Sequence, residues 1–180
     1  MKFTKTKIKG AYIIEPEPRE DSRGYFARIF AKEELKKKNI SFSIVHINRS
    51  FSKEKGVIRG MHYQRSSYAE DKIIQCLSGK IFDVALDIRK GSKTYGQWVS
   101  EILDPFSKKM LLVPKGCAHG FQSLERNSVV EYFVTEYYAP PYEEGIRFND
   151  LFFNINWPIK NAIVSKKDGS WPDFHPVKSY

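Results

Sequence analysis

Short runs of β-branched and aromatic residues recur along the chain, and turn residues separate them. Strands are enriched in such residues, and short strands at short spacing are typical of an all-β sandwich or barrel. The pattern therefore predicts an all-β jelly roll and not alternating β-α-β units. Ser78-Gly79 separates two runs and predicts a hairpin turn. The clearest runs cover residues 43–48, 72–77, 80–88, 110–113 and 128–135.

Two segments depart from the strand pattern. Residues 31–39 have a charged face and one inward position at Leu35, which predicts a single short helix. After Trp157-Pro158 the chain has further prolines and little periodicity. This predicts an irregular C-terminal arm packed on the barrel. No repeat or linker interrupts the sequence, so residues 1–180 are predicted to form one domain.

Composition narrows the classes of function. The chain is 41% hydrophobic and 28% charged, as folded domains are, and its net charge of +9 favours anionic partners such as nucleotides. The basic residues are dispersed and match no nucleic-acid-binding module. No apolar run suits a signal peptide or a membrane span, so we expect a cytoplasmic protein with neither nucleic acid nor membrane as partner. Cys76 and Cys117 stand singly in apolar runs and are expected to be reduced core residues.

The histidines decide whether a metal is expected. Residues 114–119 place His119 in a P-x-G-x-x-H spacing, which is half of the usual cupin metal signature. The other half would supply H-x-H and a following Glu, but residues 62–64 read His-Tyr-Gln. Two histidines do not complete a metal site, so we expect a metal-free protein. His46 and His175 are the remaining histidines.

Without a metal, acid–base chemistry is the natural use of isolated His, Tyr and Lys side chains. Each also has a structural interpretation, because Tyr132 could pack in a core and Lys72 could extend from a strand end into water. Regular alternation would place Arg59 opposite His62, unless Gly60 introduces a bulge. Residue by residue, these signals are weak.

Nine motifs in order are far more specific, and together they resemble the dTDP-4-dehydrorhamnose 3,5-epimerase family over essentially the whole chain. The motifs are Asp21-Ser-Arg-Gly-Tyr-Phe26, Lys55-Gly-Val-Ile-Arg-Gly-Met-His-Tyr-Gln64, Lys72, Asp83-Val-Ala-Leu-Asp-Ile-Arg89, Ser92-Lys-Thr-Tyr-Gly96, Pro114-Lys-Gly-Cys-Ala-His-Gly-Phe121, Tyr132 with Thr135 and Tyr138, Asn156-Trp-Pro158 and Ser165-Lys-Lys-Asp168.

The resemblance implies a cupin-like homodimer that needs no cofactor and acts on a nucleotide-diphosphate 4-keto-6-deoxy sugar. It makes His62 the base, supported by Asp168, and Tyr132 the opposing acid. Lys72 corresponds to the residue beside the 4-keto oxygen. A C4 ketone acidifies the protons on C3 and C5, so this residue set suits enolisation and inversion.

The resemblance also implies a set of substrate-binding residues. Arg23 and Arg59 correspond to diphosphate ligands, Arg23 reaching from the neighbouring subunit, and planar guanidinium groups suit that task. The full set is Arg23, Phe26, Arg28, His46, Asn48, Arg59, Asp83, His119, Tyr138, Glu143 and Lys167.

Two departures affect the nucleoside end. Arg28 stands where the family usually has a carboxylate, and His46 where it usually has Gln. A cation in place of an acceptor is expected to weaken recognition of a thymine imide. The substrate is therefore taken as dTDP-linked by default, with GDP and CDP as alternatives.

Other functions fit parts of the same pattern. A sugar-nucleotide 3,4-ketoisomerase would also begin with enolisation, and a single-centre epimerase would use the same scaffold. A non-catalytic sugar-nucleotide binder is a further alternative, because a fold does not determine a function.

Overall fold

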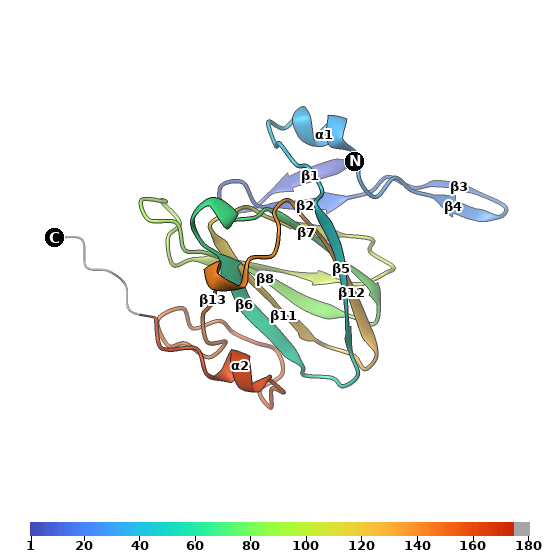
Figure 1. Ribbon diagram of the computed structural model, residues 1–180. Helices are drawn as coiled ribbons and strands as arrows, with labels where there is room; N and C mark the ends of the chain where they lie inside the picture. The colour runs from blue at the N-terminus through green and yellow to red at the C-terminus, as the bar shows by residue number, and fades with distance from the viewer. Residues whose placement is uncertain (175–180) are drawn as a thin grey trace.

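Two antiparallel sheets form the body of the protein in a computed structural model that describes residues 1–174 (Figure 1). The larger sheet has six strands in the order β1 (Lys2–Lys5), β2 (Tyr12–Glu15), β10 (Met110–Val113), β7 (Lys72–Ser78), β12 (Ser128–Val134) and β5 (His46–Ser52). The smaller has five, in the order β13 (Glu143–Gly145), β6 (Ile58–Gln64), β11 (Cys117–Ser123), β8 (Ile81–Asp87) and β9 (Trp98–Leu103). This arrangement confirms the predicted jelly roll.

The main core lies between the two sheets. Ile74 and Val130 of the larger sheet are buried in one cluster with Ile81, Ala85 and Phe121 of the smaller sheet. Because successive side chains of a strand point to opposite faces, the residues between these positions belong to the outer faces.

The outer faces of both sheets are also covered. Leu35 and Phe42, from the segment that follows β4, pack on the larger sheet, and Phe153 and Trp157 pack on the smaller one. A strand covered on both faces can be apolar throughout, which explains why all four residues of β10 are buried.

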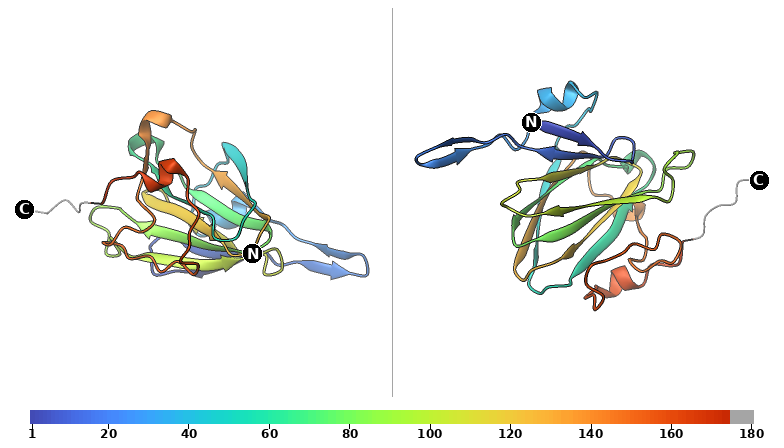
Figure 2. Two further views of the ribbon diagram at one scale, coloured as in Figure 1. Left: turned by 90° about the horizontal axis from the view of Figure 1, so that it is seen from below. Right: turned by 180° about the vertical axis from the view of Figure 1, so that it is seen from behind.

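The remaining elements lie at the edges of the body. They are α1 (Lys32–Lys36), α2 (Lys166–Gly169), the 3-10 turns η1 (Ser66–Tyr68) and η2 (Pro140–Tyr142), and the hairpin of β3 (Arg19–Asp21) and β4 (Gly24–Phe26). The hairpin projects away from both sheets in all views (Figure 2). Within residues 1–174, no helix is long and apolar enough to cross a membrane.

Several sequence predictions need correction. Ser78-Gly79 is not a hairpin turn, since β7 and β8 belong to different sheets and the turn passes the chain from one to the other. The strand predicted at residues 43–48 begins at His46 and extends to Ser52 along β12. The helix predicted at residues 31–39 is limited to Lys32–Lys36, and α2 is a second helix in the arm that was expected to be irregular.

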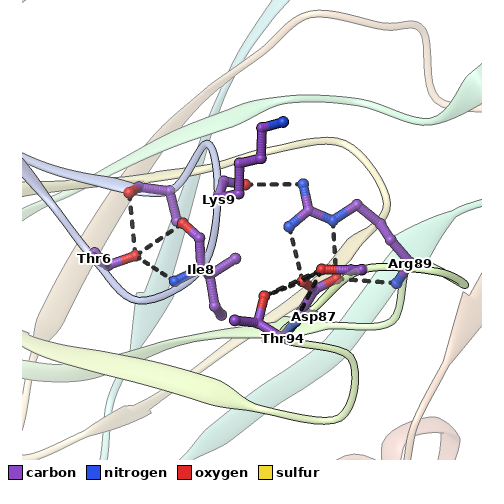
Figure 3. A network of polar contacts seen from close by, with 8 residues as sticks. Thr6, Ile8, Lys9, Asp87, Arg89 and Thr94 are labelled. Atoms are coloured by element: carbon purple, nitrogen blue, oxygen red, sulfur yellow. Dashed lines mark hydrogen bonds and ion pairs between the residues drawn. The ribbon is translucent and has the colours of Figure 1, made fainter.

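A buried carboxylate at the end of β8 holds the loop that follows this strand and, through Arg89, joins it to the loop between β1 and β2 (Figure 3). Asp87 accepts hydrogen bonds from Nε and Nη2 of Arg89 at 2.9 and 2.8 Å, and from the hydroxyls of Ser92 and Thr94, both at 2.6 Å. Arg89 also donates from Nη1 to the carbonyl of Lys9 at 2.9 Å. Burial alone would raise the pKa of Asp87, but these donors hold it far below its usual range.

Candidate active site

The polar residues of the site lie on the inner faces of the strands, at one end of the space between the sheets. Lys72 shares the inner face of β7 with Ile74 and Cys76. Two cavities of about 410 and 500 Å³ lie here, and both are lined by His62, Lys72 and Tyr132. The two cavities therefore meet at these three side chains.

A β-bulge in β6 places Arg59 on the same side as His62. In the pairing with β11, His62 lies opposite His119, but Arg59 lies opposite Phe121, so three steps on β6 match two on β11. One extra residue reverses the alternation. Both side chains therefore line the same cavity, and Met61 turns to the outer face, where it is fully buried.

His62 is paired with Asp168 of α2. Its Nε2 lies 2.6 Å from Oδ1 of Asp168, and the backbone N–H of Gly60 donates to Oδ2 at 3.4 Å. Burial would raise the pKa of Asp168, but the hydrogen bond from His62 and the nearby imidazole charge lower it below its usual value. An ionised carboxylate only accepts, so Nε2 carries the hydrogen and Nδ1 is the nitrogen able to take a proton.

A second His–Asp pair lies deeper in the smaller sheet. His119 Nε2 is 2.7 Å from Oδ1 of Asp83, and Asp83 is fully buried. The pairing orients the His119 ring towards the cavity that it shares with His62.

Tyr132 and Lys72 come from the larger sheet and face the two histidines across the cavity. Burial and the Glu70 carboxylate raise the pKa of Tyr132, with the charge of Arg59 opposing them, so the phenol is neutral at pH 7. Lys72 does not extend into water: its side chain is 11% exposed and its Nζ lies 3.0 Å from Oε1 of Glu70.

A three-residue contact lies at the edge of the first cavity. Glu143 accepts from the hydroxyl of Tyr138 at 2.5 Å and from Nζ of Lys167 at 2.6 Å. Burial acts to raise the pKa of Glu143, but the hydrogen bonds from Lys167 and Tyr138 lower it on balance. This contact joins the segment after β12, strand β13 and helix α2.

The structure brings most of the predicted site residues together. Twelve surround the two cavities or support them from behind: His46, Asn48, Arg59, His62, Lys72, Asp83, His119, Tyr132, Tyr138, Glu143, Lys167 and Asp168.

Three predicted residues lie away from these cavities. The Arg23 side chain is 88% exposed at the hairpin and pairs only with Asp21 among the described residues. Phe26 and Arg28 line a separate hollow beside the N-terminus. His175 lies outside the described residues.

Sequence reasoning missed two carboxylates and one helix. Glu70 and Glu136 line the first cavity, and no pattern in the sequence separates them from surface glutamates. Helix α2 had a signal: Ser165 caps it by accepting from the N–H of Asp168 at 3.0 Å, and the Ser-x-x-Asp spacing is a capping pattern.

Within residues 1–174, no three His, Cys, Asp or Glu side chains are grouped as metal ligands would be. Metal independence stays a prediction. Cys76 and Cys117 are buried and free, as expected, and burial raises the pKa of their thiols to about 11 and about 12.

An oriented imidazole and a neutral phenol on facing sheets, lining the same two cavities, are groups suited to acid–base chemistry on a bound molecule. A family model described as dTDP-4-dehydrorhamnose 3,5-epimerase matches residues 5–176. The chain belongs to this family of isomerases.

Individual relatives agree over nearly the full length. The dTDP-4-dehydrorhamnose 3,5-epimerase of Methanothermobacter thermautotrophicus is 39% identical over 173 residues, or 94% of this chain and 92% of that protein. The Bacillus anthracis enzyme, solved with TDP and PPi bound, has a TM-score of 0.93 at 39% identity and covers 96% of this chain and 99% of its own. The Legionella pneumophila enzyme in complex with dTDP-4-keto-L-rhamnose has a TM-score of 0.88 at 36% identity. The match covers 97% of this chain and 99% of that enzyme.

Proposed function

We propose that this epimerase inverts C3 and C5 of a dTDP-linked 4-keto-6-deoxy sugar, with His62 as base and Tyr132 as acid. One observation carries the assignment. The two groups stand on opposite sheets and line the same cavities, so a sugar ring between them presents one face to each. The family assignment favours the dTDP sugar over the GDP and CDP alternatives.

Each inversion has two proton steps. Nδ1 of His62 takes the proton from the carbon next to the ketone, and the electron pair of the broken C–H bond moves to form an enolate at O4. The Tyr132 hydroxyl then gives its proton to the same carbon from the opposite face. Exchange with water returns His62 and Tyr132 to their starting protonation states, so solvent hydrogen enters the product.

The enolate needs a positive partner where its charge develops. The Lys72 ammonium faces the cavity from the larger sheet and His119 faces it from the smaller sheet. Fixed donors in a site shielded from water stabilise such an oxyanion strongly. Asp168 and Asp83 act behind the two histidines and orient the rings.

The nucleotide is assigned to the polar edges of the same cavities. Arg59 is a ligand for the diphosphate, with its guanidinium held by the carbonyl of Phe51 at 2.9 Å. His46, Asn48 and Tyr138 line the first cavity and are assigned to the nucleoside and sugar side. No cofactor is needed for these steps.

A homodimer would place Arg23, Phe26 and Arg28 in the neighbouring site. The hairpin projects from its own subunit, with Phe26 65% exposed. Ile47 and Phe51, on edge strand β5, are more than half exposed and offer an apolar face for a second copy. Mixing inactive Arg23→Ala and His62→Ala proteins should restore activity, because each hybrid dimer contains one site with both residues; no recovery would count against the shared site. A cytoplasmic location remains part of the proposal.

Incubation in D₂O with dTDP-, GDP- and CDP-linked 4-keto-6-deoxy sugars tests the function. We expect two deuterium atoms per product, at C3 and C5, with inverted configuration by proton NMR and the dTDP substrate preferred. One deuterium would indicate a single-centre epimerase. A 3-keto product would indicate the ketoisomerase, and no incorporation with any nucleotide would indicate a binder.

A further inference from the structure

Glu70 stands out as a charged group of the site to which the proposed mechanism gives no role. It lines the first cavity, yet only 12% of its side chain is exposed. Its Oε1 lies 3.0 Å from Nζ of Lys72, which is buried to the same degree. A carboxylate and an ammonium removed from water in this way interact far more strongly than an exposed pair.

The backbone beside Glu70 is fixed from two directions. The N–H of Asp71 donates to the hydroxyl of Thr135 at 2.9 Å, and the N–H of Thr135 donates to the carbonyl of Asp71 at 3.2 Å. The N–H of Lys115 donates to Oδ1 of Asp71 at 2.9 Å. The Glu70 carboxylate is therefore held from a rigid segment, as preorganisation of a neighbouring charge requires.

We propose that Glu70 is a positioning residue of this epimerase, which holds the Lys72 ammonium against the cavity wall and keeps a negative charge beside Tyr132. The inference rests on the proposed function, because it presupposes that Lys72 stabilises the enolate and that Tyr132 donates a proton. The proposed role of Glu70 acts through Lys72 and Tyr132 and requires no contact with the sugar or the nucleotide. Its charge disfavours the phenolate, so Tyr132 stays protonated to higher pH.

Other titratable and charged groups line the two cavities with Tyr132, and they remain in place when Glu70 is changed. The titratable or charged groups around the two cavities, besides Glu70 and Tyr132 themselves, are His46, Arg59, His62, Tyr63, Lys72, His119, Glu136, Tyr138, Glu143, Lys167 and Asp168.

Two variants separate contact from charge. Glu70→Gln keeps the length of the side chain and removes the charge; we expect kcat to fall about ten- to hundredfold, KM to change less than twofold, and the alkaline limb of the kcat profile to move to lower pH. The limb moves down because loss of a nearby negative charge lowers the pKa of Tyr132. Glu70→Asp keeps the charge but withdraws it from Lys72, so kcat should fall while the limb stays.

Glu101→Gln is the matched control. Glu101 pairs with Nζ of Lys109 at 2.6 Å, is 18% exposed and lines neither cavity, so its loss should leave kcat and the pH profile unchanged. An unchanged kcat in Glu70→Gln would overturn the proposal, as would a raised KM alone or a lower kcat with an unmoved alkaline limb. A wild-type protein that incorporates no deuterium would refute the proposed function instead, so the two failures are distinguishable.

Discussion

Replacement of Asp168 by Asn tests the assignment of His62 Nδ1 as the base. The two carboxylate oxygens accept from two donors, Nε2 of His62 at 2.6 Å and the N–H of Gly60 at 3.4 Å. An amide offers only one acceptor. If its oxygen faces Gly60, its NH₂ group faces His62, makes Nε2 the acceptor and moves the ring hydrogen to Nδ1. If its oxygen faces His62, its NH₂ group faces the N–H of Gly60, and two donors then oppose each other without an acceptor.

Either outcome removes the oriented base or the charge that stabilises the imidazolium. A wrong histidine tautomer or the loss of general-base catalysis each lowers the reaction rate by roughly 10²- to 10⁴-fold. We expect the rate of Asp168→Asn to be lower than that of the wild type by a factor in this range. The assay is the initial rate of deuterium incorporation at C3 and C5 in D₂O. KM should change little, because Asp168 is 4% exposed and lies behind His62.

Asp150→Asn is the control for loss of a buried carboxylate. Asp150 is 3% exposed and accepts from the backbone N–H groups of Phe152 and Phe174 at 2.9 and 2.7 Å, away from both cavities. We expect Asp150→Asn to lower stability and leave the rate unchanged. A folded Asp168→Asn protein with wild-type exchange would refute the assignment of Nδ1 as base.

Four further predictions follow from the same geometry. Tyr132→Phe should still exchange the C3 and C5 protons but with retention of configuration, because only His62 can return a proton; NMR of the deuterated product measures this. Asp87→Asn should lower the free energy of unfolding by about 2–4 kcal/mol in urea. Because the folded-state pKa of Asp87 is depressed, its contribution to the free energy of unfolding is present above pH 4 and is lost as the pH falls. The stability of the wild type should therefore approach that of the variant in acid. Gly60→Ala should cost about 1–3 kcal/mol and reduce activity, because φ is +127° and a Cβ would lie 2.5 Å from Cα of Gly120. Cys117 should resist iodoacetamide at pH 8 in the folded protein and react in urea, as mass spectrometry would show, since burial raises its pKa to about 12.

The sequence predicted the sheets better than their connections. The run at residues 110–113 coincides with β10, and the run at 128–135 ends one residue beyond β12. The Ser78-Gly79 prediction was wrong because a tight turn with φ of +71° at Gly79 serves equally well to change sheets. Local turn chemistry specifies a reversal of the chain but not the strand that it then pairs with.

The site was predicted by residue type and by resemblance, whereas its electrostatics required the fold. Nothing in the sequence separates Glu70 from Glu136, although both line the cavity and only Glu70 forms an ion pair with Lys72 among the described residues. The ion pair makes the difference, and it depends on the loop beside Glu70, where the N–H of Asp71 donates to the hydroxyl of Thr135 on a distant part of the chain.

The bulge in β6 connects these observations to the chemistry. Regular alternation along residues 58–64 would give the cavity either Arg59 or His62, but not both. The extra residue, with Gly60 at φ +127°, places both Arg59 and His62 at the cavity. It also turns Met61 towards the core on the outer face of the smaller sheet. The same segment donates the Gly60 N–H to Asp168, so the irregularity that brings Arg59 beside His62 also helps to fix the carboxylate that is paired with His62. The sequence allowed a bulge at Gly60 as one of two alternatives, and the pairing of β6 with β11 decides between them.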